Sequence, residues 1–246
     1  MMSDTLVIIP AYNEEDNIGD VLTELRERIH DVDILVVNDG SIDRTEEVVS
    51  RFPVYLLTHP TNLGYGAALQ TGFKFAAQNG YQFVASFDAD GQHLPDDLQR
   101  IIVELHRNAE DIVIGSRFLR RDHSMVYKPS LQKKVAFKIF NSLIRLLTRT
   151  QVTDPTCGLR GLPRTVFQYY SLKNRFPADY PDANIIIHML LHGFTVREVS
   201  ILCRERASGV SQQHSGIKPV FYMFRMVLSI LSVVLHHHLT RKAGGV

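Results

Sequence analysis

Two aspartates, Asp88 and Asp90, directly follow the apolar stretch Phe83 to Phe87. Carboxylates two positions apart at a strand end can converge on one hard cation, because Mg²⁺ and Mn²⁺ prefer oxygen ligands. Gln92 and His93 come next in the chain and are candidates to complete the coordination shell. Such a cation would neutralise a diphosphate leaving group. An isolated Asp-x-Asp pattern also marks capped turns, so its position after a strand is what favours a metal site.

Two other polar segments follow the first and second apolar stretches of the chain. Proline cannot donate to a sheet ladder, so the first strand is predicted to end at Pro10. Asn13 is predicted to cap a helix that begins near Glu14, and Tyr12 offers a ring that can stack on a nucleobase or ribose. In the second segment, Asp39 can accept a hydrogen bond from a base N–H. Taken alone, each segment is an ordinary strand–turn–helix junction.

A further segment opens a predicted helix with two glycines, Gly64 and Gly66. A glycine-rich helix start can approach an anion closely. The segment matches neither the dinucleotide-binding nor the P-loop pattern, because neither Gly-x-Gly-x-x-Gly nor a following Gly-Lys-Ser/Thr is present.

A scaffold must hold these segments together, and the first half of the chain alternates strand and helix signals. Apolar stretches predict strands at Leu6–Pro10, Ile34–Val37, Val54–Leu57, Phe83–Phe87 and Ile112–Ile114, and helical spacing predicts helices at Glu14–Ile29, Gly64–Ala77 and Pro95–His106. This alternation indicates a mostly parallel sheet covered on both faces. Ligands bind at the carboxyl ends of such strands. The polar segments above, together with Gly115 to Arg117, all lie there.

A basic segment follows the predicted sheet. Between Arg117 and Arg149 nine lysines and arginines accompany one acidic residue, Asp122. Residues 130–149 are predicted to form a helix, with one face made of Lys134, Lys138, Asn141, Arg145 and Arg149. A basic amphipathic helix is typical of a membrane surface or an anionic partner. A solvated basic face on a core helix is the alternative.

The last segment, Ile217 to Leu239, also has helical spacing. Two of its three stripes are apolar, so the helix must bury most of its surface against its own domain, a partner subunit or lipid. The longest nearly apolar run, Met226 to Leu235, is shorter than the roughly 20 residues that a membrane span needs. We therefore expect attachment to a membrane surface rather than a span. No basic region of a secretory signal precedes the first strand.

Composition narrows the class further. The 246 residues are 45% hydrophobic and carry a net charge of +1, so a sizeable core is expected and no overall field favours nucleic acid. The two cysteines, Cys157 and Cys203, provide no disulfide framework and fit a reducing cytosol.

Taken in order, these segments resemble family-2 glycosyltransferases over about residues 5 to 211. The resemblance implies a GT-A fold, a mostly parallel twisted sheet flanked by helices with a C-terminal amphipathic helix. We expect a catalytic domain at residues 1–215, then the helix and tail at 216–246. The expected nucleotide-binding residues are Pro10, Ala11, Tyr12, Glu14, Asp39, Gly64, Asp88 and Ala89. The expected ligands of Mg²⁺ or Mn²⁺ are Asp88, Asp90 and Gln92.

The second half is similar to a narrower group, the dolichyl-phosphate mannose synthase-like enzymes. Residues 115–117 match their Gly-Ser-Arg, 154–160 resemble their Asp-x-x-Ser-Gly-Phe-Arg, and 206–211 resemble their Arg-x-x-Gly-x-Ser, which closes over the diphosphate. Two positions depart from the pattern. Asn38 replaces a commonly acidic residue, which leaves base selectivity open, and Cys157 replaces a usual serine.

This narrower resemblance implies transfer of a sugar from a UDP- or GDP-sugar to undecaprenyl or dolichyl phosphate. The reaction would be a single displacement with inversion, at the cytoplasmic, inner face of the membrane. A phosphate monoester with a second pKa of about 6 is largely ionised, so it needs cationic positioning more than a general base. The expected acceptor-phosphate residues are Arg117, Lys133, Lys134, Arg160 and Ser211, and the expected catalytic residues are Asp88, Asp90, Arg117, Arg206 and Asp182.

Asp182 belongs to an alternative, in which the acceptor is a sugar hydroxyl and a base becomes necessary. A nucleotidyltransferase is another alternative, but its basic glycine-rich loop after the first strand is missing. A third is a nucleotide-sugar-binding or membrane-adaptor module without catalysis, against which Asp88, Asp90 and Arg206 argue. A membrane protein or a second copy of the chain is an alternative partner for the last helix.

Overall fold

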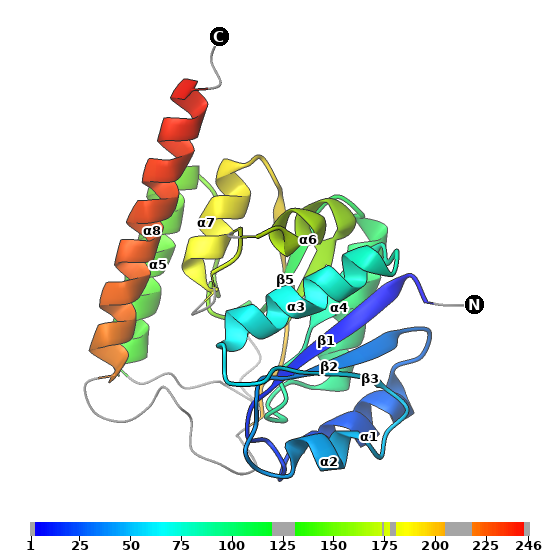
Figure 1. The fold of residues 1–246 in the computed structure, drawn as a ribbon. Helices are drawn as coiled ribbons and strands as arrows, with labels where there is room; N and C mark the ends of the chain where they lie inside the picture. Colours follow the sequence, from blue (N-terminus) through cyan, green and yellow to red (C-terminus); the bar gives the residue numbers. More distant parts are fainter. Residues whose placement is uncertain (1–2, 120–130, 174, 178–180, 205–217, 244–246) are drawn as a thin grey trace.

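The computed structural model describes residues 3–119, 131–173, 175–177, 181–204 and 218–243. Its centre is a seven-stranded sheet with the order β3-β2-β1-β4-β6-β5-β7 (Figure 1). The strands are β1 (Thr5–Ala11), β2 (Asp33–Asn38), β3 (Tyr55–Thr58), β4 (Phe83–Ser86), β5 (Ile112–Ser116), β6 (Arg160–Pro163) and β7 (Val196–Ser200). Neighbouring strands are parallel except that β6 runs antiparallel to both β4 and β5. The predicted mostly parallel sheet is confirmed.

Helices cover both faces of this sheet. They are α1 (Ile18–Arg28), α2 (Thr45–Val49), α3 (Tyr65–Gln78), α4 (Pro95–Arg107), α5 (Leu131–Thr148), α6 (Arg164–Ser171), α7 (Ala183–Leu191) and α8 (Lys218–Ala243). The helix α3 contacts α6 on one face, and α1 contacts α4 on the other. The close fit depends on glycines: a Cβ on Gly72 of α3 would meet Ile8, and one on Gly161 of β6 would meet Ile101 of α4.

Two predicted boundaries at the first segment are wrong. The strand β1 continues past Pro10 to Ala11. Pro10 is tolerated because the alternate N–H groups of β1 point towards β4, and β4 pairs with β1 only as far as Ile8. The helix α1 begins at Ile18, and Asn13 does not cap it. Asn13 instead has φ 54°, and its side-chain oxygen accepts the backbone N–H of Ile42.

The two predicted later helices are present as α5 and α8 (Figure 1). Both contact α7, and they meet each other at the rings of Phe140 and Tyr222. On α5, Phe140 and Ile144 are buried, whereas Lys134, Lys138 and Arg145 are exposed. The sheet contains two strands that the sequence did not predict, β6 and β7.

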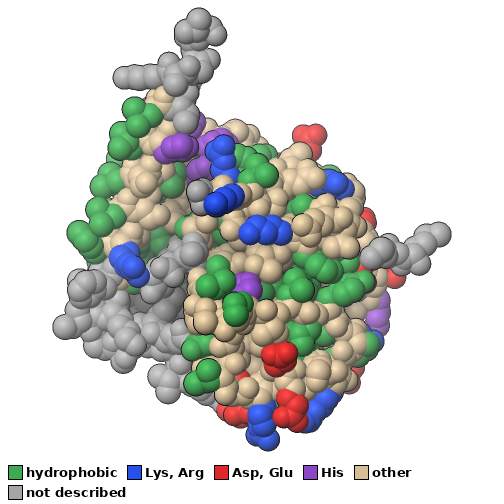
Figure 2. All heavy atoms as spheres, viewed as in Figure 1, with side chains coloured by type: hydrophobic (Ala, Val, Ile, Leu, Met, Phe, Trp, Pro, Cys, Tyr) green, Lys and Arg blue, Asp and Glu red, His purple; other side chains and the backbone are tan. Residues whose placement is uncertain are grey.

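The helix α8 has two different faces. Met226 and Ile230 are buried against the domain, and α8 contacts α7. A stripe of apolar side chains on the outer face is exposed (Figure 2): Phe224, Leu228, Leu231, Leu235 and Leu239. We call these five residues the outer stripe.

Contrary to the expectation from the sequence, Tyr222–Leu239 is long and apolar enough to cross a membrane by length and composition, with a mean hydropathy of 1.2. The sequence estimate counted only the nearly apolar run Met226–Leu235 and left out its flanking residues, which include Arg225 and His236. Only 11% of this window is buried within the domain, so its outer face lacks a cover among the described residues.

Candidate active site

The predicted nucleotide segments meet at the carboxyl ends of three parallel strands. Pro10 pairs with Val37, Ile8 pairs with Ser86, and the three strands β1, β2 and β4 are parallel. Asp39 therefore leaves β2 at the same edge at which Asp88 leaves β4, with β1 between them. This is the arrangement required if both residues line one cleft, and an opposite-edge placement would have refuted it.

The first two segments are fastened to each other. The backbone N–H of Asn13 donates to Ser41 Oγ at 2.9 Å, and that of Glu14 donates to Thr45 Oγ1 at 2.8 Å. The N–H of Glu15 donates to Asp43 at 3.1 Å. Serine, threonine and aspartate of the second segment thus satisfy backbone donors of the first. Ala11 is buried and Tyr12 and Glu14 are partly exposed beside them.

Asp39 closes the second segment onto the start of α3. One carboxylate oxygen accepts the N–H of Leu63 at 2.9 Å and lies 2.7 Å from His59 Nδ1. The other accepts the N–H of Gly64 at 2.8 Å. Asp39 is only 3% exposed, so in this structure it organises the loop. Its predicted contact with a base, and that of Gly64 with an anion, stay predictions.

Asp88 follows β4 at the carboxyl end of that strand, and two neighbouring side chains contact its carboxylate. Tyr65, the first residue of α3, donates its hydroxyl to Asp88 Oδ1 at 3.0 Å, and His93 Nε2 lies 3.2 Å from Oδ2. Burial alone would raise the pKa of Asp88, but the hydrogen bond and charge of His93, the Tyr65 hydroxyl and the charge of Arg160 bring it below its usual value. The carboxylate is thereby kept ionised, as a cation ligand must be.

A glycine provides the space for that carboxylate. A Cβ added to Gly158 would lie 2.6 Å from Asp88 Oδ2 and 2.9 Å from Oδ1. Ser86, two residues before Asp88, donates its hydroxyl to the Gly158 carbonyl at 2.6 Å. The segment from Asp154 to Arg160 is thus pressed against the Asp-Ala-Asp loop with only a hydrogen atom between them.

Asp90 and Gln92 shape the other side of the loop. The N–H of Gln92 donates to Asp90 Oδ1 at 3.1 Å. The Gln92 carbonyl accepts the N–H of Arg204 at 2.8 Å, and the Gln92 amide reaches the Arg204 carbonyl at 3.5 Å. The described chain therefore reaches Arg204 beside the Asp-Ala-Asp loop. The predicted residues Arg206 and Ser211 come directly afterwards and lie outside the described residues.

The donor set fits a hard divalent cation of the kind that is shared with a substrate. Among the described residues no group of three or more His, Cys, Asp and Glu side chains could hold a metal. Mg²⁺ is commonly held by one or two carboxylates together with substrate phosphates. Asp88 and Asp90 supply such a pair, and the Asp88 side chain is 28% exposed. Gln92, whose amide faces Arg204, is the weakest of the three predicted ligands.

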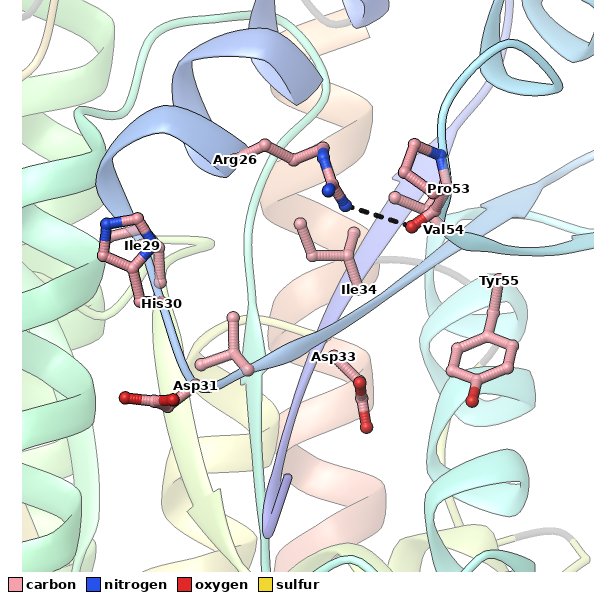
Figure 3. Close-up of a pocket in the computed structure, with 10 residues that line it drawn as sticks. Arg26, Ile29, His30, Asp31, Asp33, Ile34, Pro53, Val54 and Tyr55 are labelled. Carbon is pink, nitrogen blue, oxygen red and sulfur yellow. Dashed lines mark hydrogen bonds between the residues drawn. The ribbon is translucent and has the colours of Figure 1, made fainter. Parts of the chain in front are cut away.

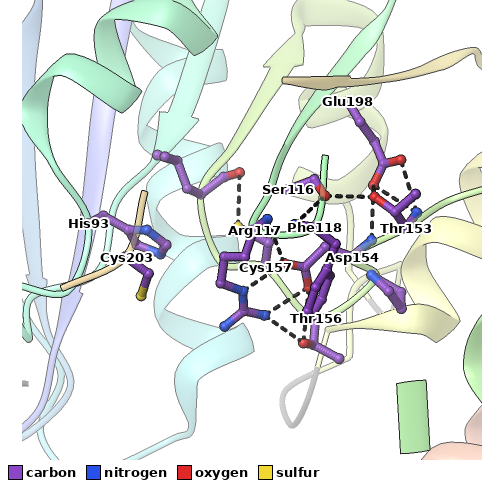
Figure 4. Close-up of polar contacts among 12 residues, drawn as sticks. His93, Ser116, Arg117, Phe118, Thr153, Asp154, Thr156, Cys157, Glu198 and Cys203 are labelled. Atoms are coloured by element: carbon purple, nitrogen blue, oxygen red, sulfur yellow. Dashed lines mark hydrogen bonds and ion pairs between the residues drawn. The ribbon is translucent and has the colours of Figure 1, made fainter. Parts of the chain in front are cut away.

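Arg117 forms a buried pair just beyond β5 (Figure 4). Its Nε and Nη2 donate to the two oxygens of Asp154 at 2.6 and 2.8 Å, and Nη2 also reaches Thr156 Oγ1 at 3.0 Å. Glu198 of β7 supports the pair by accepting the N–H groups of Thr153 and Asp154. Such a bidentate pair fixes the orientation of the guanidinium plane. The geometry gives Arg117 a positioning role, and its contact with phosphate stays a prediction.

Arg160 is likewise buried, and its donors meet backbone carbonyls. Nε donates to Cys157 at 2.8 Å, Nη1 to Pro181 at 2.6 Å and Nη2 to Pro155 at 3.2 Å. Nη2 also lies 3.7 Å from Asp182 Oδ1. Arg160 thus holds the 155–158 segment in place beneath Asp88. This placement favours an organising role over the predicted direct contact with an acceptor phosphate.

Asp182 precedes α7 and faces Arg160. Burial raises its pKa above the usual value, against the opposing effects of the Arg160 charge and of a hydrogen bond from Tyr222. The Tyr222 hydroxyl, on α8, donates to Asp182 Oδ2 at 2.6 Å. A carboxyl with a raised pKa has the property expected of a general base.

Some site residues were missed from the sequence, and others lie apart from the site. Tyr65 was not singled out, although its place at the start of the glycine-rich helix was a usable signal. The sequence held no signal for Glu198, because the strand that carries it, β7, was not predicted. Lys134 is exposed on α5, and the side chain of Lys133 lies outside the described part.

A hollow of about 470 Å³ lies away from these residues, at the amino ends of β2 and β3 (Figure 3). It is lined by Arg26, Ile29, His30, Asp31, Val32, Asp33, Ile34, Pro53, Val54 and Tyr55. Because ligands of such sheets bind at the carboxyl ends of strands, this hollow is not the candidate site.

Comparison with known proteins supports the resemblance to glycosyltransferases. The polyprenol monophosphomannose synthase of Mycolicibacterium smegmatis is 33% identical over 215 residues, 85% of this chain and 80% of that protein. The undecaprenyl-phosphate mannosyltransferase of Micrococcus luteus is 32% identical over 219 residues, 86% of this chain and 88% of that one.

The fold is shared with glucosyl-3-phosphoglycerate synthase from Mycobacterium tuberculosis, crystallised with Mn²⁺ and UDP. The TM-score is 0.65 at 17% identity, over 95% of this chain and 79% of that chain. The family model described as "Glycosyl transferase family 2" matches residues 6–171. The chain belongs to glycosyltransferase family 2, and it is a GT-A-fold enzyme of the dolichyl-phosphate mannose synthase-like subgroup.

Proposed function

We propose that this glycosyltransferase moves a sugar from a UDP- or GDP-sugar to a polyprenyl phosphate, with inversion and with a divalent cation. The observation that carries the proposal is the Asp88 carboxylate, held ionised beside the nucleotide segments and cradled by Gly158. Relatives named as polyprenyl-phosphate mannosyltransferases support the acceptor class. A structural neighbour crystallised with Mn²⁺ and UDP supports the cation and favours UDP.

The chemistry follows from the charges at the site. A divalent cation on Asp88 and Asp90 would offset the charge that develops on the departing diphosphate. An ionised phosphate acceptor attacks the anomeric carbon from the face opposite the diphosphate, which inverts the configuration. The oxygen–sugar bond to the diphosphate breaks as the new one forms. Arg117, which Asp154 fixes just beyond β5, is the described cation that would guide an anionic acceptor.

The acceptor also defines where the enzyme works. A polyprenyl phosphate keeps its tail in the bilayer, so the site must come to the headgroup layer. We propose that the outer stripe of α8 contacts acyl chains and that Lys134, Lys138 and Arg145 of α5 contact anionic headgroups, on the inner face of the membrane. Residues 216–246 would then serve attachment and 1–215 catalysis. The exposed stripe and the exposed basic face of α5 support this proposal.

A transfer assay tests the acceptor class. The purified protein is incubated with radiolabelled UDP- and GDP-sugars, Mn²⁺ or Mg²⁺ and undecaprenyl phosphate, and the label is then extracted into organic solvent. We expect extractable label that requires the lipid phosphate and is lost in Asp90→Ala. Undecaprenol, which has the same tail without the phosphate, is the matched control acceptor. Label in the organic phase with undecaprenol alone, or with neither acceptor, would contradict the proposal.

A second candidate is transfer to a sugar hydroxyl, which the buried Asp182 favours. Its raised pKa suits a group that removes a proton from a hydroxyl. In the same assay, label on a water-soluble oligosaccharide acceptor and none in the organic phase would support this candidate. Asp182→Asn would then abolish transfer, whereas transfer to an already ionised phosphate does not require a base.

A further inference from the structure

The described part of α8 reaches the candidate site through the hydroxyl of Tyr222. Tyr222 lies in the first turns of α8, and its hydroxyl donates to Asp182 Oδ2 at 2.6 Å. The ring of Tyr222 packs edge-on against Phe140 of α5, with 6.2 Å between ring centroids. The hydroxyl is therefore held by packing as well as by its hydrogen bond, as a group that positions another must be.

Asp182 connects Tyr222 to the candidate site through Arg160. Its second oxygen faces Arg160 Nη2 at 3.7 Å, and Arg160 binds the carbonyls of Pro155 and Cys157. Gly158, next in the chain, lies against the Asp88 carboxylate. A continuous series of contacts thus runs from α8 to the residue that would hold the cation. Packed side chains and buried hydrogen-bond networks of this kind are the physical means by which one site can be coupled to another.

The same helix presents the outer stripe on its far side. Phe224 is 62% exposed and Leu228 is 49% exposed, within two turns of Tyr222. A second bond, from Asn184 Nδ2 to Ser229 Oγ at 2.8 Å, attaches α8 to α7 without touching the Asp182 carboxylate. One helix therefore carries both an apolar face without a described cover and a hydroxyl directed at the site.

We propose that Tyr222 is a positioning residue, which couples the seating of α8 on a lipid surface to the sugar-transfer site by holding Asp182 against Arg160. The inference rests on the proposed function, because it assumes that the outer stripe meets lipid. Tyr222 itself touches no reacting atom. It acts through Asp182 and Arg160 on the segment that cradles Asp88.

Tyr222→Phe removes the hydroxyl and keeps the ring against Phe140. Ser229→Ala is the matched control, because it removes a different described bond between α7 and α8 and leaves the Asp182 carboxylate with its Tyr222 partner. Both variants and the wild type are assayed with the donor found active in the transfer assay and with farnesyl phosphate, a short water-soluble acceptor. The assay is run without vesicles and with vesicles of phosphatidylcholine and phosphatidylglycerol. Circular dichroism and thermal unfolding verify the fold of each variant.

We expect vesicles to raise the kcat of the wild type and of Ser229→Ala. The Tyr222→Phe variant should lose that response and have a kcat about tenfold lower with vesicles, as expected for one hydrogen bond to a charged group. The KM for the nucleotide sugar should change less than kcat, because Tyr222 reaches Asp88 only through Asp182, Arg160 and Gly158.

The pH profile gives a second readout that a purely structural role would not move. Asp182 is faced by Arg160, Tyr222, Asp88 and Arg117. Asp182 pairs with Arg160 as a charged group only while it is ionised. Removing the Tyr222 hydroxyl removes an effect that lowers the pKa of Asp182, so the acid limb of kcat should move to higher pH in Tyr222→Phe and stay in place in Ser229→Ala.

Three results would overturn the coupling. They are a Tyr222→Phe variant with wild-type kcat and pH profile, an equal loss in both variants, and a wild type that vesicles do not stimulate. The proposed function fails differently, because the wild type would then transfer no sugar to any polyprenyl phosphate.

Discussion

Gly158 offers the sharpest test of the site, because its only side-chain hydrogen faces a carboxylate. In Gly158→Ala the new Cβ would lie 2.6 Å from Asp88 Oδ2, whereas ordinary contact begins at about 3.4 Å. The carboxylate must therefore retreat by about 0.8 Å. It cannot do so freely, because Tyr65 and His93 hold its two oxygens.

A displacement of that size at a reacting centre lowers rates about 100-fold, which corresponds to about 2.7 kcal/mol in transition-state free energy. We expect kcat/KM of Gly158→Ala to fall by this factor in the lipid-extraction assay. The loss should be partly relieved by raising the Mn²⁺ concentration, because the displaced carboxylate binds the cation more weakly.

Gly19→Ala is the matched control. Gly19 lies in α1 away from the site, and the nearest atom to its Cβ would be Val48 Cγ1 at an ordinary 3.4 Å. This variant should keep wild-type kcat/KM and gain up to about 1 kcal/mol in stability, since alanine favours a helix over glycine. If Gly158→Ala retains more than about a third of wild-type kcat/KM while folded, the proposed place of the Asp88 carboxylate in catalysis is wrong.

Three further predictions concern the metal, the membrane and pH. Excess EDTA should reversibly inhibit the wild type and Asp90→Ala should abolish transfer; full activity in chelator would refute the metal assignment. Each basic residue near an anionic leaflet contributes about 1 kcal/mol, so the wild type should float with anionic vesicles at low salt, and Lys134→Glu, Lys138→Glu and Arg145→Glu together should abolish flotation. A triple variant that floats like the wild type would exclude this surface. Burial first, then His192, His236, Arg175 and His237, lower the pKa of His188 to about 4, below its value of about 6.5 in the unfolded chain. Because His188 is only partly buried, solvent screens part of this effect, and the unfolding free energy should fall by roughly 1 to 2 kcal/mol as pH drops from about 6.5 to 4. Urea titrations should show this fall in the wild type and less of it in His188→Gln; equal slopes would exclude His188 as its source.

Most of the parallel sheet could be predicted, because β1, β2 and β4 are buried on both faces and appear as continuous apolar runs. The strand β6 could not, because its sequence Arg-Gly-Leu-Pro is short and neither apolar nor alternating. Its strand conformation is imposed by pairing with β4 and β5 on either side. Partners distant in sequence decided the structure there, as they often do for strands.

The site shows the same division. Asp88 and Asp90 could be found because two carboxylates after an apolar run form a local pattern. The roles of Arg117 and Arg160 could not, since Asp154 and the carbonyl of Pro181 reach them only in the folded chain. Likewise, Tyr222 belongs to the more polar stripe of α8, and only packing shows that this stripe faces Asp182.

The position of β5 in the sheet has a consequence for how the chain acquires its activity during synthesis. Both sheet neighbours of β5, namely β6 and β7, come later in the sequence. Until the ribosome has added β6, at residues 160–163, the strand β5 has no sheet partner. Until it has added residues up to Ser200, β5 also lacks β7, and Arg117 has no Glu198-supported partner. The nucleotide half around β1, β2 and β3 can assemble early from neighbouring segments, whereas the half that positions Arg117 must wait. A nascent chain can therefore form the half that carries the predicted nucleotide segments before it can position Arg117.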